Sequence, residues 1–279
     1  MSDSRYEPLS KSAYRAWAVV RALPPIAWLA LLWVAAYDDK YRPSQGVAIA
    51  TFAALIAYYI WLRIRRNLRS SRVAQRHAAT AKLLGAGDLE SAAKTIDETL
   101  DDARATPPVH CILLVQRAQL FLRLGDADRS LSLLKAIVAT HWLDDARLAQ
   151  GASSLASALA MTELARGDLG EAERWQKEAH AKIKEAERVQ LLPLDTLVDA
   201  RCGRYAEAIE RIDEALAGAE ETLAPRAVDL LKLLRAFAAE QLGKPAEATK
   251  DLDADVDYLV KDWPELRAFV AKNALAAVT

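Results

Sequence analysis

Residues 160–172 read AMTELARGDLGEA, and this stretch contains the pattern that decides the fold. A small residue, Ala160, lies seven positions before Gly167, and another, Ala172, lies five positions after it. Glycine readily adopts the left-handed conformation that ends a helix, and two helices approach closely only where their facing side chains are small. The stretch therefore predicts two helices that are joined by a tight turn and meet at small side chains.

The same pattern occurs five times along the chain. Its glycines are Gly87, Gly125, Gly167, Gly203 and Gly243, at spacings of 38, 42, 36 and 40 residues. Seven residues before each glycine lie Thr80, Ala118, Ala160, Thr196 and Ala236, and five after it lie Ala92, Ser130, Ala172, Ala208 and Ala248. Nine residues after it lie Ile96, Leu134, Gln176, Ile212 and Leu252, apolar in four of five cases. A regular period near 40 predicts an array of helical hairpins with these positions in its core.

Expected helix boundaries follow from the turns and the apolar periodicity. First helices are expected at about 73–85, 108–124, 143–166, 189–202 and 222–242, and second helices at about 89–104, 127–140, 169–188, 205–218 and 245–260. Pro264 then begins a further helix, because proline suits the first helical position. Residues 263–279 are therefore predicted to cap the open end of the array.

On these residues the chain resembles the tetratricopeptide-repeat (TPR) proteins, whose units have a small residue late in the first helix, a Gly-Asp-like turn and an alanine early in the second. The resemblance covers about residues 73–260 and implies an all-α fold, a TPR-like α-solenoid of about five helical hairpins. The chain departs from the family in its period, since about 34 residues is typical. It also lacks the usual large aromatics of the first helix and has Gln176 at a core position.

The resemblance also implies a concave groove lined by first-helix residues that binds a protein partner. Carried over by the glycine register, the candidate partner-binding residues are Ile112, Val115, Gln119, Leu122, Met161, Leu164, Leu197, Arg201, Leu230, Leu233, Phe237 and Gln241. Most of them are apolar, which suits an apolar helix or an extended apolar peptide. The alternative is a tight superhelix in which these residues pack on one another.

The first 72 residues are expected to form a membrane anchor. Residues 46–62 read GVAIATFAALIAYYIWL and are followed at once by RIRRNLRSSR, and residues 16–37 form an earlier apolar stretch. Apolar stretches of this length flanked by arginines are typical of transmembrane helices at the cytoplasmic boundary. We therefore expect a transmembrane hairpin of helices 16–37 and 46–62, a basic collar at 63–72 and a repeat domain at 73–262. A cleaved signal peptide and two buried helices of a soluble core are the alternatives.

Charge distribution predicts the orientation of the anchor. Residues 1–72 contain 11 Lys and Arg and 4 Asp and Glu, which leaves 26 and 34 in residues 73–279. Basic flanks indicate that the amino terminus and the repeat domain are both cytoplasmic, in a bilayer with anionic headgroups. Trp17, Arg21, Trp61, Arg63, Arg65 and Arg66 are expected at the membrane interface. Alanine- and arginine-rich usage suggests a bacterial inner membrane.

The composition of the body indicates a binding function. An acidic body argues against nucleic acid and favours a neutral or basic protein partner. His77, His110, His141 and His180 lie in separate segments, and no metal or cofactor motif occurs. We therefore expect a membrane-anchored scaffold that recruits a protein partner, and no enzyme. Two alternatives remain: an accessory protein, since the layout resembles inner-membrane proteins associated with bacterial haem biosynthesis, and an enzyme with a site in the groove.

Overall fold

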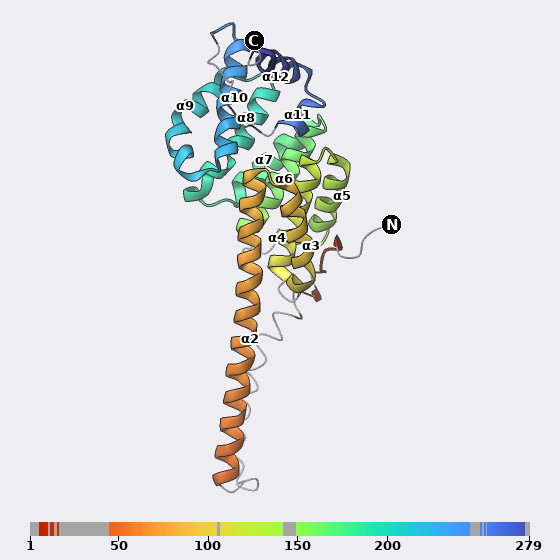
Figure 1. Cartoon of the computed structure of the whole chain (residues 1–279), viewed down its shortest axis with the longest axis vertical. Helices are drawn as coiled ribbons and strands as arrows, with labels where there is room; N and C mark the ends of the chain where they lie inside the picture. Colours follow the sequence, from red (N-terminus) through yellow and green to blue (C-terminus); the bar gives the residue numbers. More distant parts are fainter. Residues whose placement is uncertain are drawn as a thin grey trace.

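The computed structural model of the chain consists of helices (Figure 1). It describes residues 6–10, 12–13, 16, 45–104, 107–141, 149–245, 252, 254 and 256–276. Some side chains within these ranges also lie outside the description, among them those of residues 45–55. The described residues contain no strand, which confirms the all-α prediction.

Up to α10, the α-helices follow one another in the order that the sequence predicts. The described helices are α2 (Gln45–Ala86), α3 (Leu89–Ala103), α4 (Pro107–Arg123), α5 (Ala127–Val138), α6 (Ala149–Ala165), α7 (Leu169–Lys182), the 3₁₀ helix η5 (Glu185–Leu191), α8 (Leu192–Arg201), α9 (Tyr205–Thr222), α10 (Pro225–Gln241), α11 (Asp257–Val260) and α12 (Pro264–Ala276). Neighbours in sequence contact each other in the pairs α2–α3, α4–α5, α6–α7 and α8–α9.

The predicted turns form as expected. All five glycines of the pattern have positive φ, from +68° to +80°. At Gly167, the glycine N–H donates to the Leu164 carbonyl at 3.0 Å and the Asp168 N–H donates to the Glu163 carbonyl at 3.0 Å. These two bonds satisfy carbonyls at the end of α6, and the Asp168 carboxylate then accepts from the Glu171 N–H at the start of α7. The dipeptide Gly167-Asp168 thus ends α6 and begins α7.

The small residues of the pattern lie where the paired helices meet. All of those that the structure describes are buried: Thr80, Ala92, Ala118, Ser130, Ala160, Ala172, Thr196, Ala208 and Ala236. Ala248 lies outside the described residues. Among the polar small residues, the Thr80 hydroxyl donates to the Arg76 carbonyl at 2.9 Å, and the Ser130 hydroxyl lies 3.1 Å from that of Thr162 on the neighbouring α6. The prediction that these positions lie in the core is confirmed for the described residues.

Helix α2 is longer than any predicted element. It runs for 42 residues without interruption, so the expected helices at 46–62 and 73–85 are one helix and the basic collar lies inside it. Its carboxyl-terminal part contacts α3, α4 and α10, and the rest projects away from the body (Figure 1). No helix within the described part of the chain has the combination of length and apolarity that a membrane crossing requires, so the expected transmembrane hairpin lacks support there. Of the predicted span 16–37, residues 17–37 lie outside the described residues.

The fifth hairpin differs from the prediction. A second helix was expected at 245–260, but Lys244, Pro245, Leu252, Ala254 and Val256 are not helical and α11 is only four residues long. Between 251 and 257 the sequence alternates aspartate with apolar residues. Aspartate is a poor helix former, which is consistent with the absence of helix at Leu252, Ala254 and Val256.

The third hairpin departs from its predicted boundary as well. Its second helix was expected to reach residue 188, but α7 ends at Lys182, where Ile183 is extended at φ −80° and ψ 146°. The 3₁₀ helix η5 then leads into α8, and Pro193 lies in the first turn of α8. Because proline lacks an N–H, it suits this first turn.

The close approach of α8 and α9 can be tested at Ala208. This residue is fully buried in α9, whereas Ala206 in the same turn of the helix is exposed. We expect Ala208→Leu to lower the free energy of unfolding by about 2–3 kcal/mol, because the added carbons must push the helices apart. The control Ala206→Leu should change it by less than about 0.5 kcal/mol. Urea titration followed by circular dichroism measures both, and equal effects would contradict the assigned helix contact.

Candidate partner-binding groove

The structure brings seven of the twelve predicted partner-binding residues into one cluster, called here the inner groove. Leu122, Leu164, Leu197, Leu230, Leu233 and Phe237 are buried in it, and Met161 packs against them half-buried. These residues come from α4, α6, α8 and α10, which are the first helices of successive hairpins. Leu122 and Phe237, for example, are 115 positions apart in sequence and lie in the same buried apolar cluster.

The other predicted residues lie elsewhere. Val115 belongs to a second cluster formed mainly by α3, α4, α5 and α6. Ile112, Gln119 and Arg201 are half-buried, and Gln241 is exposed at the end of α10. The inner groove is therefore narrower than the predicted surface and is centred on the carboxyl-terminal half of the body.

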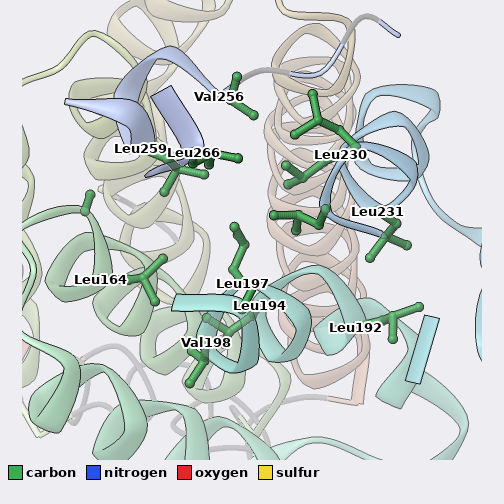
Figure 2. Packing of buried hydrophobic residues seen from close by; sticks show 14 of the residues in the cluster. Leu164, Leu192, Leu194, Leu197, Val198, Leu230, Leu231, Val256, Leu259 and Leu266 are labelled. Atoms are coloured by element: carbon green, nitrogen blue, oxygen red, sulfur yellow. The ribbon is translucent and has the colours of Figure 1, made fainter. Parts of the chain in front are cut away.

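The inner groove is occupied by the chain itself. Residues 256–269, called here the C-terminal segment, bury the side chains Val256, Leu259, Trp263, Leu266 and Phe269 in the same cluster. Figure 2 shows Leu259 and Leu266 of this segment facing a common interior with Leu164, Leu197 and Leu230. Helix α11 lies against α4 and α6. The groove expected to be open is filled, by a segment that sequence reasoning had assigned to the last hairpin and the cap.

Phe237 is the centre of the contact between the groove and the C-terminal segment. Its ring centroid lies 5.5 Å from that of Trp263 at 89° and 5.6 Å from that of Phe269 at 69°. The Tyr205 ring makes a third edge-on contact with Phe237, at 5.8 Å and 86°. Edge-to-face pairs of this kind add about 0.5–1.5 kcal/mol beyond their buried area. The segment is thus held by specific aromatic geometry as well as by burial.

Arg201 contacts the C-terminal segment at the edge of this aromatic cluster. Its guanidinium carbon lies 4.9 Å from the Trp263 ring centroid, and its Nη2 donates to the Asp262 carbonyl. Burial lowers the pKa of Arg201, but a guanidinium stays protonated at any physiological pH. A cation over an indole ring is a favourable electrostatic contact. Arg201, predicted to touch a partner, touches the C-terminal segment in this structure.

A hollow of about 440 Å³ adjoins α11 on the side of the turn between α4 and α5. Charged side chains of both signs line it: Asp126, Asp128, Arg166, Lys261 and Asp262. Arg166 donates to Glu163 at 2.9 Å and to Asp128 at 3.0 Å, so its charge is already satisfied. The hollow is therefore a solvated margin of the groove, without a group aimed at a ligand.

A network of charged and polar side chains joins α7, α8 and α9. The buried carboxylates Asp195 and Asp199 are its centre. Asp195 accepts from Gln176 at 2.7 Å and lies 2.8 Å from the His180 Nε2 atom. The remaining contacts are Asp199 with Arg204 at 2.9 Å and with Arg211 at 3.0 Å, and Arg204 with Glu173 at 2.8 Å. Buried carboxylates persist only when paired in this way.

Sequence reasoning missed this network although a signal for it exists. Glu173, Gln176 and His180 recur at helical spacing on α7, and Asp195 and Asp199 are four residues apart on α8. Residues at these spacings share one helix face, so two polar stripes on neighbouring helices indicate a pairing. Gln176, which breaks the apolar pattern, is explained by its bond to Asp195.

The described residues offer little nucleophilic chemistry. The Cys202 thiol lies 3.7 Å from a Glu173 oxygen, and burial raises its pKa. Burial also raises the pKa of Cys111, to about 12. Thiols with raised pKa values are poor nucleophiles, because the thiolate is the reactive form. Across the described parts of the chain, no group of three or more His, Cys, Asp or Glu side chains could hold a metal ion.

The predicted membrane-interface residues can be located only in part. Trp61 is exposed on α2 and stacks on Tyr58 with ring centroids 6.0 Å apart. Trp17 and Arg21 lie outside the described residues, as do the side chains of Arg63, Arg65 and Arg66.

No family model, curated protein or solved structure matches the chain. Function must therefore be inferred from the occupied groove and the exposed surfaces.

His110 gives a prediction for the dependence of stability on pH. The residue is buried in α4, and neither ring nitrogen has a hydrogen-bond partner among the residues that the structure describes. Burial lowers its pKa to about 4, from 6.5 in the unfolded chain. Between these values the unfolded chain binds more protons, so stability falls as pH drops from 6.5 to 4, by about 3 kcal/mol in total.

We expect His110→Leu to remove this part of the pH dependence. The wild-type chain should lose thermal stability between pH 6.5 and 4.5 more steeply than the variant, and the two should run parallel above pH 7. Thermal unfolding at a series of pH values measures the difference. Parallel curves over the whole range would show that His110 is accessible to protons in the folded chain.

Proposed function

We propose that this chain is a membrane-attached scaffold whose TPR-like α-solenoid of helical hairpins holds a protein partner at the cytoplasmic face. The observation that carries the proposal is α2, a single helix that joins an exposed apolar stretch directly to the first hairpin. Residues 16–37 and 46–62 are proposed as the hairpin that enters the lipid. The bilayer would be the inner membrane of a bacterium, with anionic headgroups facing the arginines at 63–72.

Exposed apolar side chains on α2 support attachment to lipid. They are Ile56, Tyr58, Ile60, Trp61 and Ile64, with exposed fractions between 38% and 57%. A cluster of exposed apolar residues on one element marks a surface that meets lipid or another protein. Tyrosine and tryptophan are enriched at the membrane boundary, and here they lie next to the arginine-rich residues 63–72.

Contacts near the amino terminus support a topology in which both ends of the chain lie on one side of the membrane. The Tyr6 hydroxyl donates to Asp97 on α3 at 3.0 Å and accepts from Arg117 on α4 at 2.9 Å. Its ring lies edge-on to Phe121 at 6.1 Å. The chain is thus tied to the body near residue 6 and returns to it along α2, as a membrane hairpin with two cytoplasmic ends requires.

The hairpin array supports a binding function. First helices of successive hairpins bring distant residues together into one apolar groove, and the surrounding body is acidic. Such a groove suits an apolar helix from a neutral or basic protein. The accessory role in haem biosynthesis and the groove enzyme stay predictions, because no contact in the described residues favours either.

Attachment to lipid can be tested with charged substitutions on α2. We expect Ile56→Asp/Ile60→Asp to lower the carbonate-resistant membrane fraction at least about fivefold, since each aspartate costs about 3 kcal/mol in a membrane helix. The control Leu124→Asp/Leu242→Asp changes two exposed leucines of the body and should leave this fraction unchanged. Recovery of the wild-type chain in the aqueous fraction would rule out the anchor.

The proposed topology can be tested with epitope tags at the two ends of the full chain. In right-side-out spheroplasts both tags should resist added protease, and in inverted vesicles both should be cleaved. A tag on the periplasmic domain of a co-expressed membrane protein serves as the control for sidedness. Tags on opposite sides would contradict a two-helix hairpin, whatever the lipid affinity of α2.

A further inference from the structure

The apolar residues of the C-terminal segment recur at intervals of three or four positions. Val256, Leu259, Trp263, Leu266 and Phe269 lie at positions i, i+3, i+7, i+10 and i+13. Leu259 lies on α11, Leu266 and Phe269 lie on α12, and Trp263 lies in the bend between the two helices. All five anchors are buried, whereas the intervening Asp257, Lys261, Glu265 and Ala268 are exposed. The segment therefore contacts the groove as a bound peptide does.

The way in which the segment is attached differs from that of the hairpins. Each hairpin is closed by a glycine turn and by small residues at a helix contact, but α11 and α12 are joined to α10 through residues of which Lys244, Pro245, Leu252 and Ala254 are not helical. The bend between α11 and α12 is satisfied within the segment, since the Arg267 guanidinium donates to the Val260 carbonyl at 3.0 Å. This hydrogen bond lies within the segment, so the Val260 carbonyl keeps its partner when the segment leaves the groove.

Polar contacts between the segment and the groove lie at the rim. Arg201 donates to the Asp262 carbonyl, and just beyond the segment Lys272 on α12 forms an ion pair with Glu240 on α10 at 2.9 Å, in which the lysine side chain is 68% exposed. Exposed ion pairs contribute little to stability, because water competes for both charges. The free energy of the contact therefore comes from the five apolar anchors, and above all from Trp263 and Phe269 on Phe237. A ligand with the same anchors can replace them.

We propose that the C-terminal segment is an intramolecular competitor that closes the inner groove, and that the groove recognises a segment of a protein partner with the same anchor spacing, the same bend between two short helices and an aromatic residue against Phe237. This deepens the proposed scaffold function and rests on it. An intramolecular ligand lowers the apparent affinity for a partner by the fraction of molecules in which the groove is open. The contact between the C-terminal segment and the groove thus sets how tightly a partner must bind in order to be recruited.

The test uses the full chain in detergent micelles and a fluorescein-labelled peptide of residues 256–272. In the variant Leu259→Ala/Trp263→Ala the segment is weakened while the groove is intact, so the peptide should bind at least tenfold more tightly than to the wild-type chain, by fluorescence anisotropy. The matched control Asp257→Ala/Glu265→Ala changes exposed residues of the same segment and should bind the peptide as the wild type does.

A second peptide makes the result specific to the groove. When the positions of Trp263 and Phe269 are both alanine in the peptide, binding to the weakened variant should be lost. Equal affinity of wild type and weakened variant, or binding of the alanine peptide, would overturn the proposal. Loss of helicity in the weakened variant, measured by circular dichroism, would also overturn it, because the segment would then be an inseparable part of the core. None of these outcomes affects the protease test of topology, so the two proposals can fail separately.

Discussion

The fold depends on how closely two helical backbones can approach. In the first four hairpins the pattern residues on both helices are buried and no larger than threonine, and a glycine with φ near +75° reverses the chain between the two helices. A larger side chain at either contact would separate the helices, and a residue with a Cβ would strain the turn. Since the turns fix the pairs, they also fix which faces of α4, α6, α8 and α10 point into the common groove.

The incomplete fifth hairpin explains why the groove is filled. Helix α10 carries many buried apolar residues, and the helix expected to pair with it at 245–260 does not form over the described residues. An uncovered apolar face is unfavourable in water. The C-terminal segment covers that face instead, with the rings of Trp263 and Phe269 packed on Phe237. The same segment therefore both caps the end of the array and fills the groove.

Local features of the fold could be predicted from the sequence. The glycine turns, the buried small residues and the core positions such as Ile96 and Ile212 follow from spacing within a few residues, and the structure confirms them. The start of α12 at Pro264 is likewise a local property. The length of α2 was missed because a charged stretch at 63–72 suggested a boundary, although arginine is a good helix former.

Contacts between distant segments could not be predicted in the same way. The apolar residues of 256–269 show that the segment is amphipathic, but nothing in their spacing says which helices they contact. The partners of Asp195 come from α7 and α9, so this carboxylate is explained only once three helices are placed together. For the same reason the predicted groove included Val115, whose helix face turns to the other cluster.

Helix α2 has a mechanical consequence. An unbroken helix of 42 residues is a rod rather than a flexible linker, and it enters the first hairpin without a hinge. At 1.5 Å per residue its length is about 63 Å, so tilting it by about 10° displaces one end relative to the other by about 11 Å. A force on the amino-terminal end of α2 therefore rotates α3 and α4 together with α2. The body and α2 change orientation as one unit.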